Sequence, residues 1–289
     1  MPELPEVETI RRDLAEHILN QSVASIHILS AKTAHNPAAF FKKSLQGREF
    51  QSVSRRGKLL IFDIRDGDFL LVHLKMTGQL IYIDKKRRVA GGHSSGVDRI
   101  VDKKLPGRHT RVWLEFKNGG RLFFNDLRKF GYWKIVGQAE LDKILRDNYG
   151  PEPLTGLFTV SSLSAVAKGK KVKIKALLLD QKRIAGLGNI YVDEALWLAG
   201  IKPTRLAQSL SSAEIKKLWQ AINKVIAKAI KYRGTTFSDY VDSRGQKGNF
   251  SNFLQVYGRA GEKCARCGGT IKKEKIAGRG THYCTNCQK

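Results

Sequence analysis

The four cysteines of the chain lie close together in the sequence, in two pairs with metal-binding spacing. Cys264 and Cys267 form one C-x2-C pair, Cys284 and Cys287 form the other, and sixteen residues separate the pairs. Two such pairs, on two turns joined by a hairpin, suit the tetrahedral coordination of Zn²⁺. Chance clustering of buried thiols is the alternative, and it does not account for every cysteine of the chain. Since four thiolates leave no open position for water, we predict one structural Zn²⁺.

Disulfide bonds are the other use of paired cysteines, and they require an oxidising compartment. The chain has no apolar run of about 20 residues, the length of a membrane-spanning helix. Residues Met1 to Glu8 carry acids where a secretory signal carries bases. We therefore expect a soluble cytoplasmic protein whose cysteines bind metal.

A large positive charge predicts an anionic partner. The 289 residues include 52 Lys and Arg against 26 Asp and Glu, a formal net charge of +26. Nucleic acid is the simplest partner for such a charge. Ribosomal proteins, membrane-surface proteins and polyphosphate binders share it, so composition does not separate an enzyme from a passive binder.

Two basic segments are candidates for contact with that partner. Gly278-Arg279-Gly280 lies near the second strand of the expected cysteine hairpin, where flexible glycines allow a guanidinium to approach a phosphate. A solvated arginine in a turn is the alternative. The segment from Asp84 to His109 holds eight Lys or Arg against three Asp, and we expect it to be a mobile basic loop that adds phosphate affinity.

The elements that must position these residues change character along the chain. Val7, Ile10, Leu14 and Ile18 recur at helical spacing and predict one amphipathic helix. Short runs typical of β-strands follow, several of them separated by glycine-containing turns. These runs are residues 23–29, 50–53, 59–64, 69–74, 80–83, 112–116 and 122–124. They favour an antiparallel sandwich or a flattened barrel.

Beyond the two prolines of residues 150–153 the pattern becomes helical, which marks the predicted domain boundary. Ser211 and Glu214 form a capping-box pattern ahead of an apolar helical face that should end at Gly234. A further helix should begin near Asn189, after a tight glycine turn.

Five motifs, in order along nearly the whole chain, resemble the formamidopyrimidine-DNA glycosylase family. They are MPELPEVE at residues 1–8, HLKMTG at 73–78, DLRKFG at 126–131, QKRIAGLGN at 181–189 and the cysteine hairpin. Each motif is weak alone, whereas five in this order are highly specific. Related endonuclease VIII-like enzymes prefer oxidised pyrimidines and usually carry glycine at the position of Leu4, so Leu4 favours the oxidised-purine branch.

The resemblance implies an α+β protein. An N-terminal antiparallel β-sandwich with an N-terminal helix would cover residues 1–150, and a helix-two-turn-helix DNA-binding domain residues 151–250. The zinc hairpin would cover residues 251–289. The implied activity is base-excision repair by a bifunctional enzyme. It would remove 8-oxoguanine and formamidopyrimidines from duplex DNA and cleave the abasic site by β,δ-elimination. Since two domains grip one duplex without a symmetry partner, we expect a monomer.

The family's nucleophile corresponds to Pro2. Once Met1 is removed, Pro2 has a secondary amine with a pKa of roughly 8, partly neutral at pH 7. Its attack on the deoxyribose C1′ would expel the base and leave an iminium. Glu3 would be the general acid and base. Glu6 would support the active-site backbone, and an acid favoured by the helix dipole is the alternative.

The resemblance implies two further sets of residues. The family's catalytic set corresponds to Pro2, Glu3, Lys58 and Arg279, and its DNA-binding set to Glu6, His73, Met76, Arg128, Phe130 and Asn189. Lys58 would contact a phosphate and the lesion nucleotide, and His73, Asn189 and Arg279 would grip phosphates. For Lys58 the alternative is an ordinary surface-loop lysine, and for His73 it is a half-buried strand histidine.

Base flipping leaves a void in the duplex that needs an apolar or planar filler. By resemblance Met76 would fill it, Phe130 would wedge between base pairs and Arg128 would face the orphaned cytosine. Sandwich core is the alternative for Met76 and Phe130. Residues 235–249 resemble the loop that closes over the flipped base. The pyrimidine-lesion branch and a non-enzymatic zinc-hairpin binder of nucleic acid are the competing functions.

Overall fold

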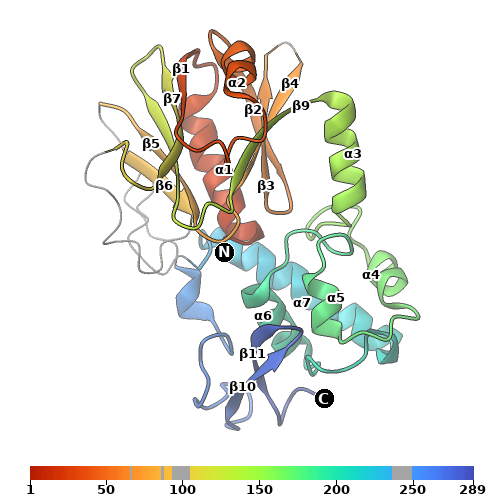
Figure 1. The fold of residues 1–289 in the computed structure, drawn as a ribbon. Coiled ribbons are helices and arrows are strands. Elements are labelled where there is room, and N and C mark those ends of the chain that lie inside the picture. Colours follow the sequence, from red (N-terminus) through yellow and green to blue (C-terminus); the bar gives the residue numbers. More distant parts are fainter. Residues whose placement is uncertain (66, 86–87, 93–104, 236–248) are drawn as a thin grey trace. The chain divides into compact units, whose positions relative to one another are not determined.

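The computed structural model describes residues 1–65, 67–85, 88–92, 105–235 and 249–289 (Figure 1). It contains two compact units. The first comprises Met1–Leu145 and Tyr232–Asn249, and the second comprises Arg146–Lys231 and Phe250–Lys289.

The first unit is built on two antiparallel sheets. One sheet has the order β1 (Val23–Ile28), β7 (Thr110–Phe116), β8 (Arg121–Asp126), β5 (Gly78–Ile83) and β6 (Arg88–Gly92). The other has the order β2 (Phe50–Arg56), β3 (Leu59–Ile64), β4 (Asp68–His73) and β9 (Tyr132–Gly137). Helix α1 (Leu4–Ile18) lies between the sheets (Figure 1), and α2 (Ala38–Leu45) contacts β1.

A single hydrophobic core joins both sheets to α1. The helix contributes the predicted periodic residues Val7, Ile10, Leu14 and Ile18, none more than 3% exposed. Inward-facing residues of both sheets surround them, because alternate strand positions point to one face. The predicted sandwich and its N-terminal helix are therefore confirmed.

The turn between β2 and β3 places a functional candidate. Arg56 pairs with Leu59, so Gly57 and Lys58 alone form the turn. Gly57 has a φ of 57°, the left-handed region that tight hairpin turns require and glycine adopts readily. The turn predicted from the Arg56-Gly57 pair is thus present.

The basic loop expected between Asp84 and His109 is partly wrong, because residues 88–92 form the edge strand β6. Val89 is buried, and the strand pairs with β5. A Cβ on Gly91 would lie 2.3 Å from Cγ1 of Ile10, so glycine lets this strand approach α1 closely. A short glycine-ended run has almost no periodicity to detect. Residues 86–87 and 93–104 of the segment lie outside the described part of the chain.

The second unit consists of helices and one hairpin. After α3 (Gln138–Asn148), which ends just ahead of the two predicted boundary prolines, the elements are α4 (Val160–Ala167), α5 (Ile174–Leu179), α6 (Asn189–Ala199), α7 (Ser212–Lys231), β10 (Ile271–Ile276) and β11 (Arg279–Cys284). Short 3-10 helices occupy Ala207–Ser209 and Phe250–Phe253. None of the helices in the described part of the chain has the length and apolarity that crossing a membrane requires.

The caps of the two predicted helices are present. At the start of α7, the Ser211 N–H donates to Glu214 Oε2 at 2.8 Å, and the Glu214 N–H donates to Ser211 Oγ at 3.3 Å. Helix α6 begins at Asn189, as predicted, after Gly188 at its N-cap. Helix α7 ends at Lys231, before the Gly234 expected to end it.

A carboxylate and three arginines lock α1 to β2. Glu8 accepts hydrogen bonds from Arg11 (2.9 Å), Arg12 (2.7 Å) and Arg55 (2.8 Å). Burial raises the pKa of Glu8, but the hydrogen bonds from Arg11 and Arg12 and the charge of Arg55 outweigh it and hold the pKa at about 2.

This lowered pKa predicts acid sensitivity. Glu8 stabilises the fold above the carboxyl's ordinary pKa of 4.5, and the stabilisation is lost as pH falls through about 2. Glu8→Gln should reduce the free energy of unfolding at neutral pH by up to about 3 kcal/mol. The exposed Arg12 contributes less than the other two arginines to this value, because solvent screens its charge. Urea unfolding from neutral pH to about pH 2 measures this. Glu16→Gln, the same change at an exposed position of α1, should leave the pH profile unchanged; an equal effect of both variants contradicts the prediction.

Candidate functional site

The first residues of the chain are held in the first unit. Pro2 and Glu3 are buried and lead directly into α1. Glu6 reaches back along the helix, and its Oε2 accepts from the Glu3 N–H at 2.9 Å. Its other oxygen, Oε1, accepts from the N–H (2.8 Å) and the Oγ1–H (3.1 Å) of Thr235. Glu6 therefore connects the backbone beside Pro2 to Thr235.

A second contact fixes the same segment to α1. Arg233 Nη2 donates to both carboxylate oxygens of Asp13 at 2.6 Å. Between these two anchors, a Cβ on Gly234 would lie 2.5 Å from Glu6 Oε1, and the φ of Gly234 is 81°. Both the close approach to Glu6 and the positive φ therefore require glycine at position 234. Neither Asp13 nor Arg233 was predicted from the sequence, because their pairing joins segments far apart in the chain. Residues 236–248, most of the predicted closing loop, lie outside the described residues.

Lys58 and His73 lie on neighbouring strands. The β3–β4 register pairs Leu59 with His73, so Lys58 follows directly in the adjoining turn. Lys58 is only 5% exposed, which excludes the surface-loop alternative. His73 is half-buried at the end of β4, which agrees with the alternative interpretation of a half-buried strand histidine.

The hydrogen bonding of His73 fixes its tautomer. The backbone N–H of Lys75 donates to His73 Nδ1 at 3.0 Å, so Nδ1 carries no proton and Nε2 is the ring's donor. Burial, together with the charges of Lys75 and Lys58, lowers the pKa of His73 to about 3. His73 is therefore a neutral donor at physiological pH, not a cation.

Met76, Arg128 and Phe130 form one exposed cluster. Met76 is 37% exposed and Phe130 is 47% exposed, so neither belongs to the sandwich core. Arg128 Nη1 donates to Met76 Sδ at 3.2 Å, and its guanidinium lies 4.6 Å from the centre of the Phe130 ring. The structure thus brings together the three side chains that the resemblance grouped. A sandwich that buries most of its other aromatic side chains leaves this apolar cluster exposed.

Asp126 shapes the loop that carries this cluster. The carboxylate is fully buried and accepts from the Thr77 hydroxyl, from the Arg128 N–H at 3.2 Å and from the Gly131 N–H at 2.7 Å. A Cβ on Gly131 would lie 2.6 Å from Phe124. Asp126 lies within the DLRKFG motif, but its role could not be predicted from the sequence because Thr77 becomes its neighbour only in the fold.

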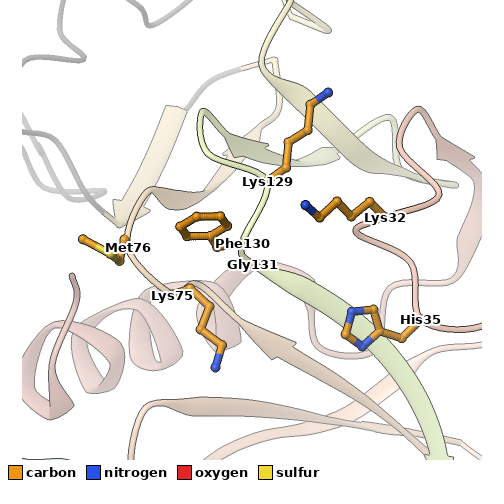
Figure 2. Close-up of a pocket in the computed structure, with 7 residues that line it drawn as sticks. All are labelled: Lys32, His35, Lys75, Met76, Lys129, Phe130 and Gly131. Atoms are coloured by element: carbon orange, nitrogen blue, oxygen red, sulfur yellow. The ribbon is translucent and has the colours of Figure 1, made fainter.

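Behind the cluster lies a pocket of about 530 Å³ (Figure 2). Figure 2 shows Met76 and Phe130 toward one side of it and His35 toward the other. The remaining lining residues are Lys32, Lys75, Lys129 and Gly131.

The pocket favours anions beside an apolar edge. Lys75 lies 5.7 Å from the centre of the Tyr132 ring, and His35 stacks on the same ring at 4.7 Å. Burial lowers the pKa of His35, and the charges of Lys134 and Lys75 lower it further. The positive charge of the pocket therefore comes from lysines. These lysines were not predicted as a site, although Lys75 lies in the HLKMTG motif and Lys129 in the DLRKFG motif.

In the second unit, α6 holds the hairpin that carries Arg279. Asn189 Nδ2 donates to the carbonyl of Gly280 at 2.8 Å, next to the exposed Arg279. One turn along, Asp193 Oδ2 accepts from the His282 N–H at 2.9 Å. Asp193 also pairs with Lys175 at 2.5 Å, with both side chains fully buried. Such a pair requires good geometry to offset desolvation, which makes the position of α5 against α6 specific.

Two further α6 side chains bind the segments that precede and contain the first cysteine pair. The carboxylate of Glu194 accepts three backbone N–H groups at 2.9 Å, those of Gln255, Val256 and Tyr257. Trp197 packs in a buried cluster with Cys264 and Cys284. None of Asp193, Glu194 and Trp197 was predicted, because helical periodicity identifies a buried face but not its polar partners.

The cysteines are arranged to hold zinc. Their four Sγ atoms lie within 4.8 Å of one another, with 3.7 Å between Cys264 and Cys287 and 3.5 Å between Cys267 and Cys284. Tetrahedral zinc–thiolate coordination separates sulfurs by about 3.8 Å, whereas a disulfide joins them at about 2.0 Å. The residues therefore fit one Zn²⁺ that is fully coordinated by protein, and the predicted structural metal is confirmed.

The hairpin turn itself is tight. Ala277 and Gly278 connect β10 to β11, and both have positive φ, 51° and 72°. This conformation suits a two-residue hairpin turn, and it places Arg279 at the first position of β11.

Three family models match consecutive parts of the chain. Residues 1–133 match the formamidopyrimidine-DNA glycosylase N-terminal domain, and residues 149–241 match the formamidopyrimidine-DNA glycosylase H2TH domain. Residues 261–289 match the zinc finger found in FPG and IleRS.

Curated relatives and solved structures cover the full length. A formamidopyrimidine-DNA glycosylase of Pelotomaculum thermopropionicum is 42% identical over 291 residues, 100% of this chain and 99% of the relative. A formamidopyrimidine-DNA glycosylase of Desulforamulus reducens is 42% identical over 292 residues, which are 100% of this chain and 99% of the relative. A mutant of the Lactococcus lactis FPG, solved with a Fapy-dG containing DNA, is 38% identical with a TM-score of 0.88, and the match covers 100% of both chains. The complex between the Lactococcus lactis Fpg and an abasic-site containing DNA is 38% identical with a TM-score of 0.88, and the match covers 99% of both chains.

The His73 geometry predicts a neutral ring over a wide pH range. In ¹⁵N NMR of the imidazole, Nε2 should be protonated and Nδ1 unprotonated from about pH 4 to pH 8. A proton on Nδ1, or a titration near the ordinary pKa of about 6.5, contradicts the prediction.

The cysteine geometry predicts one zinc per chain, measurable by elemental analysis. Cys284→Ser, or removal of the metal by a chelator, should abolish amide-exchange protection in β10 and β11 because metal binding and folding of such hairpins are coupled. The β-sandwich should keep its protection and serves as the internal control. Retention of hairpin protection without metal would contradict a structural role.

Proposed function

The chain belongs to the formamidopyrimidine-DNA glycosylase family, and from that membership we propose that it removes oxidised purines from duplex DNA and then cleaves the strand at the abasic site. DNA glycosylase activity in base-excision repair follows from the family itself. The choice of lesion, the lyase step and the residue roles are the proposal. The observation that carries it is the exposed Met76–Arg128–Phe130 cluster on an otherwise well-packed sandwich.

In this proposal Pro2 is the nucleophile after removal of Met1. Its nitrogen forms a bond to C1′ of the deoxyribose, the bond from C1′ to the base breaks, and the base leaves with the electron pair and takes up a proton. The nitrogen then gives up its proton, the C1′–O bond of the sugar ring breaks and the ring oxygen takes up a proton, which leaves a cationic iminium. Loss of the C2′ proton then breaks the C3′–O bond, and a second elimination breaks the C5′–O bond. A secondary amine suits this role because its imine carries the charge without a further proton.

Glu3 moves the protons in these steps, onto the sugar ring oxygen and from C2′. Glu6 keeps the nucleophile in place by its hydrogen bond to the Glu3 N–H. The fixed backbone matters, because small misplacements of reacting atoms reduce rates strongly.

The phosphate contacts use donors of different kinds. Lys58 supplies a buried charge and His73 a neutral N–H, so His73 orients a phosphate without adding to the salt dependence of binding. Asn189 and Arg279 supply contacts from the second unit, with Asn189 at the start of α6. The lysine-lined pocket behind Phe130 would receive a further phosphate.

The insertion roles follow from the cluster's chemistry. Phe130 and Met76 are apolar and exposed, which suits them to fill the void left by a flipped base. Arg128 is positioned by both neighbours to present donors to the unpaired cytosine. We further propose that the enzyme acts as a monomer on bacterial DNA in the cytoplasm.

Covalent trapping tests the mechanism. In the presence of borohydride, the protein without Met1 should become bonded to 8-oxoguanine DNA through Pro2, as mass spectrometry of the N-terminal peptide would show. Pro2→Gly should lower kcat by at least about 100-fold, because a primary amine replaces the secondary amine and its imine needs a further proton to carry the charge. Pro5→Gly, the same change within the first turn of α1, should keep most of the activity.

The substrate class is tested in the same assay. Excision of 8-oxoguanine should greatly exceed excision of thymine glycol, and the reverse order would assign the pyrimidine branch. An unmodified Pro2 in protein that cuts damaged DNA at the parental rate would disprove the nucleophile. Binding without any excision would favour the non-enzymatic alternative.

A further inference from the structure

The indole of Trp197 is hydrogen-bonded to a zinc ligand. Trp197 Nε1–H donates to Cys264 Sγ at 3.3 Å, from α6 to the first cysteine pair. Trp197 is 9% exposed and Cys264 is 2% exposed, so little water competes for either group. An indole has one polar hydrogen, and in this chain a cysteine sulfur accepts it.

Arg266, which lies between the cysteines of this pair, holds the indole on its other side. Its guanidinium lies 4.3 Å from the centre of the Trp197 ring, and Nη2 donates to the Leu198 carbonyl at 3.2 Å. A cation over an aromatic ring is attracted to the ring's electrons. It also makes the indole N–H a stronger donor, because it withdraws electron density from the ring.

The charge of the metal centre gives this contact a function. Four thiolates around Zn²⁺ carry a double negative charge, which neighbouring donors and cations must compensate where the ligands are buried, as Cys264 and Cys284 are. Donors to ligand atoms orient the ligands and tune the metal site. An N–H donated to a thiolate offsets part of its negative charge and fixes the direction in which the sulfur faces the metal.

We propose that Trp197 is a positioning residue of the zinc centre, where its N–H holds the Cys264 sulfur in the orientation that binds the metal and so slows loss of Zn²⁺. Arg266 supports it by holding the ring. This inference rests on the zinc site and not on the proposed reaction, so failure of the one leaves the other unchanged.

The chain contains a matched control. Trp219 is a partly buried tryptophan of the same unit, and its Nε1–H donates to the Phe158 carbonyl at 2.8 Å, away from the cysteine cluster. Trp219→Phe therefore removes an indole N–H bond without touching a ligand. A general loss of stability would appear in both variants, whereas an effect on the metal should appear only at Trp197.

The direct test leaves the protein unaltered except for its metal. In protein loaded with ¹¹³Cd and labelled with ¹⁵N-tryptophan, the Trp197 indole proton should show a scalar coupling to cadmium, transmitted through the hydrogen bond and Sγ. The Trp219 indole proton should show none. Absence of the coupling at Trp197 would overturn the proposal.

The functional test measures zinc retention. Trp197→Phe should weaken zinc affinity by about 10-fold or more in competition with a chromophoric chelator, as loss of a partner of a ligand does elsewhere. Benzothienylalanine at position 197, which keeps the ring's shape and lacks the N–H, should give the same loss. Trp219→Phe should match the parent. Parental zinc affinity in the benzothienylalanine protein would show that Trp197 only fills space and would overturn the proposal.

Discussion

The burial of α1 inside the sandwich is the constraint on which the first unit depends. Chain termini usually fray, because few contacts oppose their conformational freedom. Here the helix that begins at Leu4 presents Val7, Ile10, Leu14 and Ile18 to a core shared by both sheets. Displacing this helix would expose that core to water. Glu3 is therefore as buried as an interior residue, which the reaction proposed for Pro2 requires of its neighbour.

Carboxylates on the same helix direct the surrounding backbone. Glu6 binds Thr235, Asp13 binds Arg233, and Glu8 binds Arg55 of β2. Each pair joins segments that are distant in sequence, and each is at least partly buried, so losing one partner would leave a charge poorly solvated. The contacts of Glu6 and Glu8 give a structural role to two acids of the first motif, which by spacing alone resemble an ordinary acidic first turn of a helix.

The second unit has its own organising element in α6. Asn189, Asp193, Glu194 and Trp197 contact the hairpin or the segments leading into it. The small hairpin lacks the core needed for independent stability, so it depends on metal and on this helix. The position of Arg279 depends on α6 and on the metal site. Asn189 of α6 holds the hairpin next to its turn, beside Arg279, and Cys284 lies at the opposite end of the hairpin.

Much of this protein could be predicted from local signals. The cysteine spacing predicted the metal, short β-type runs separated by turns predicted seven of the strands, and Ser211 with Glu214 predicted the start of α7. Ordered motifs predicted the family. Signals of this kind succeed because the responsible residues are close in sequence or repeat with a fixed period.

Only the tertiary structure decided the rest. Helices α2, α3, α4 and α5 and strands β6 and β9 were not predicted individually, because most of these short sequences acquire a structural preference only from packing and pairing. The buried charge of Lys58, the neutral state of His73 and the bond from Trp197 to Cys264 likewise arise from distant segments. By itself the sequence determined which chemical groups are present and which local conformations they favour. Burial and long-range neighbours, which set the pKa and the partner of each group, exist only once the chain is folded.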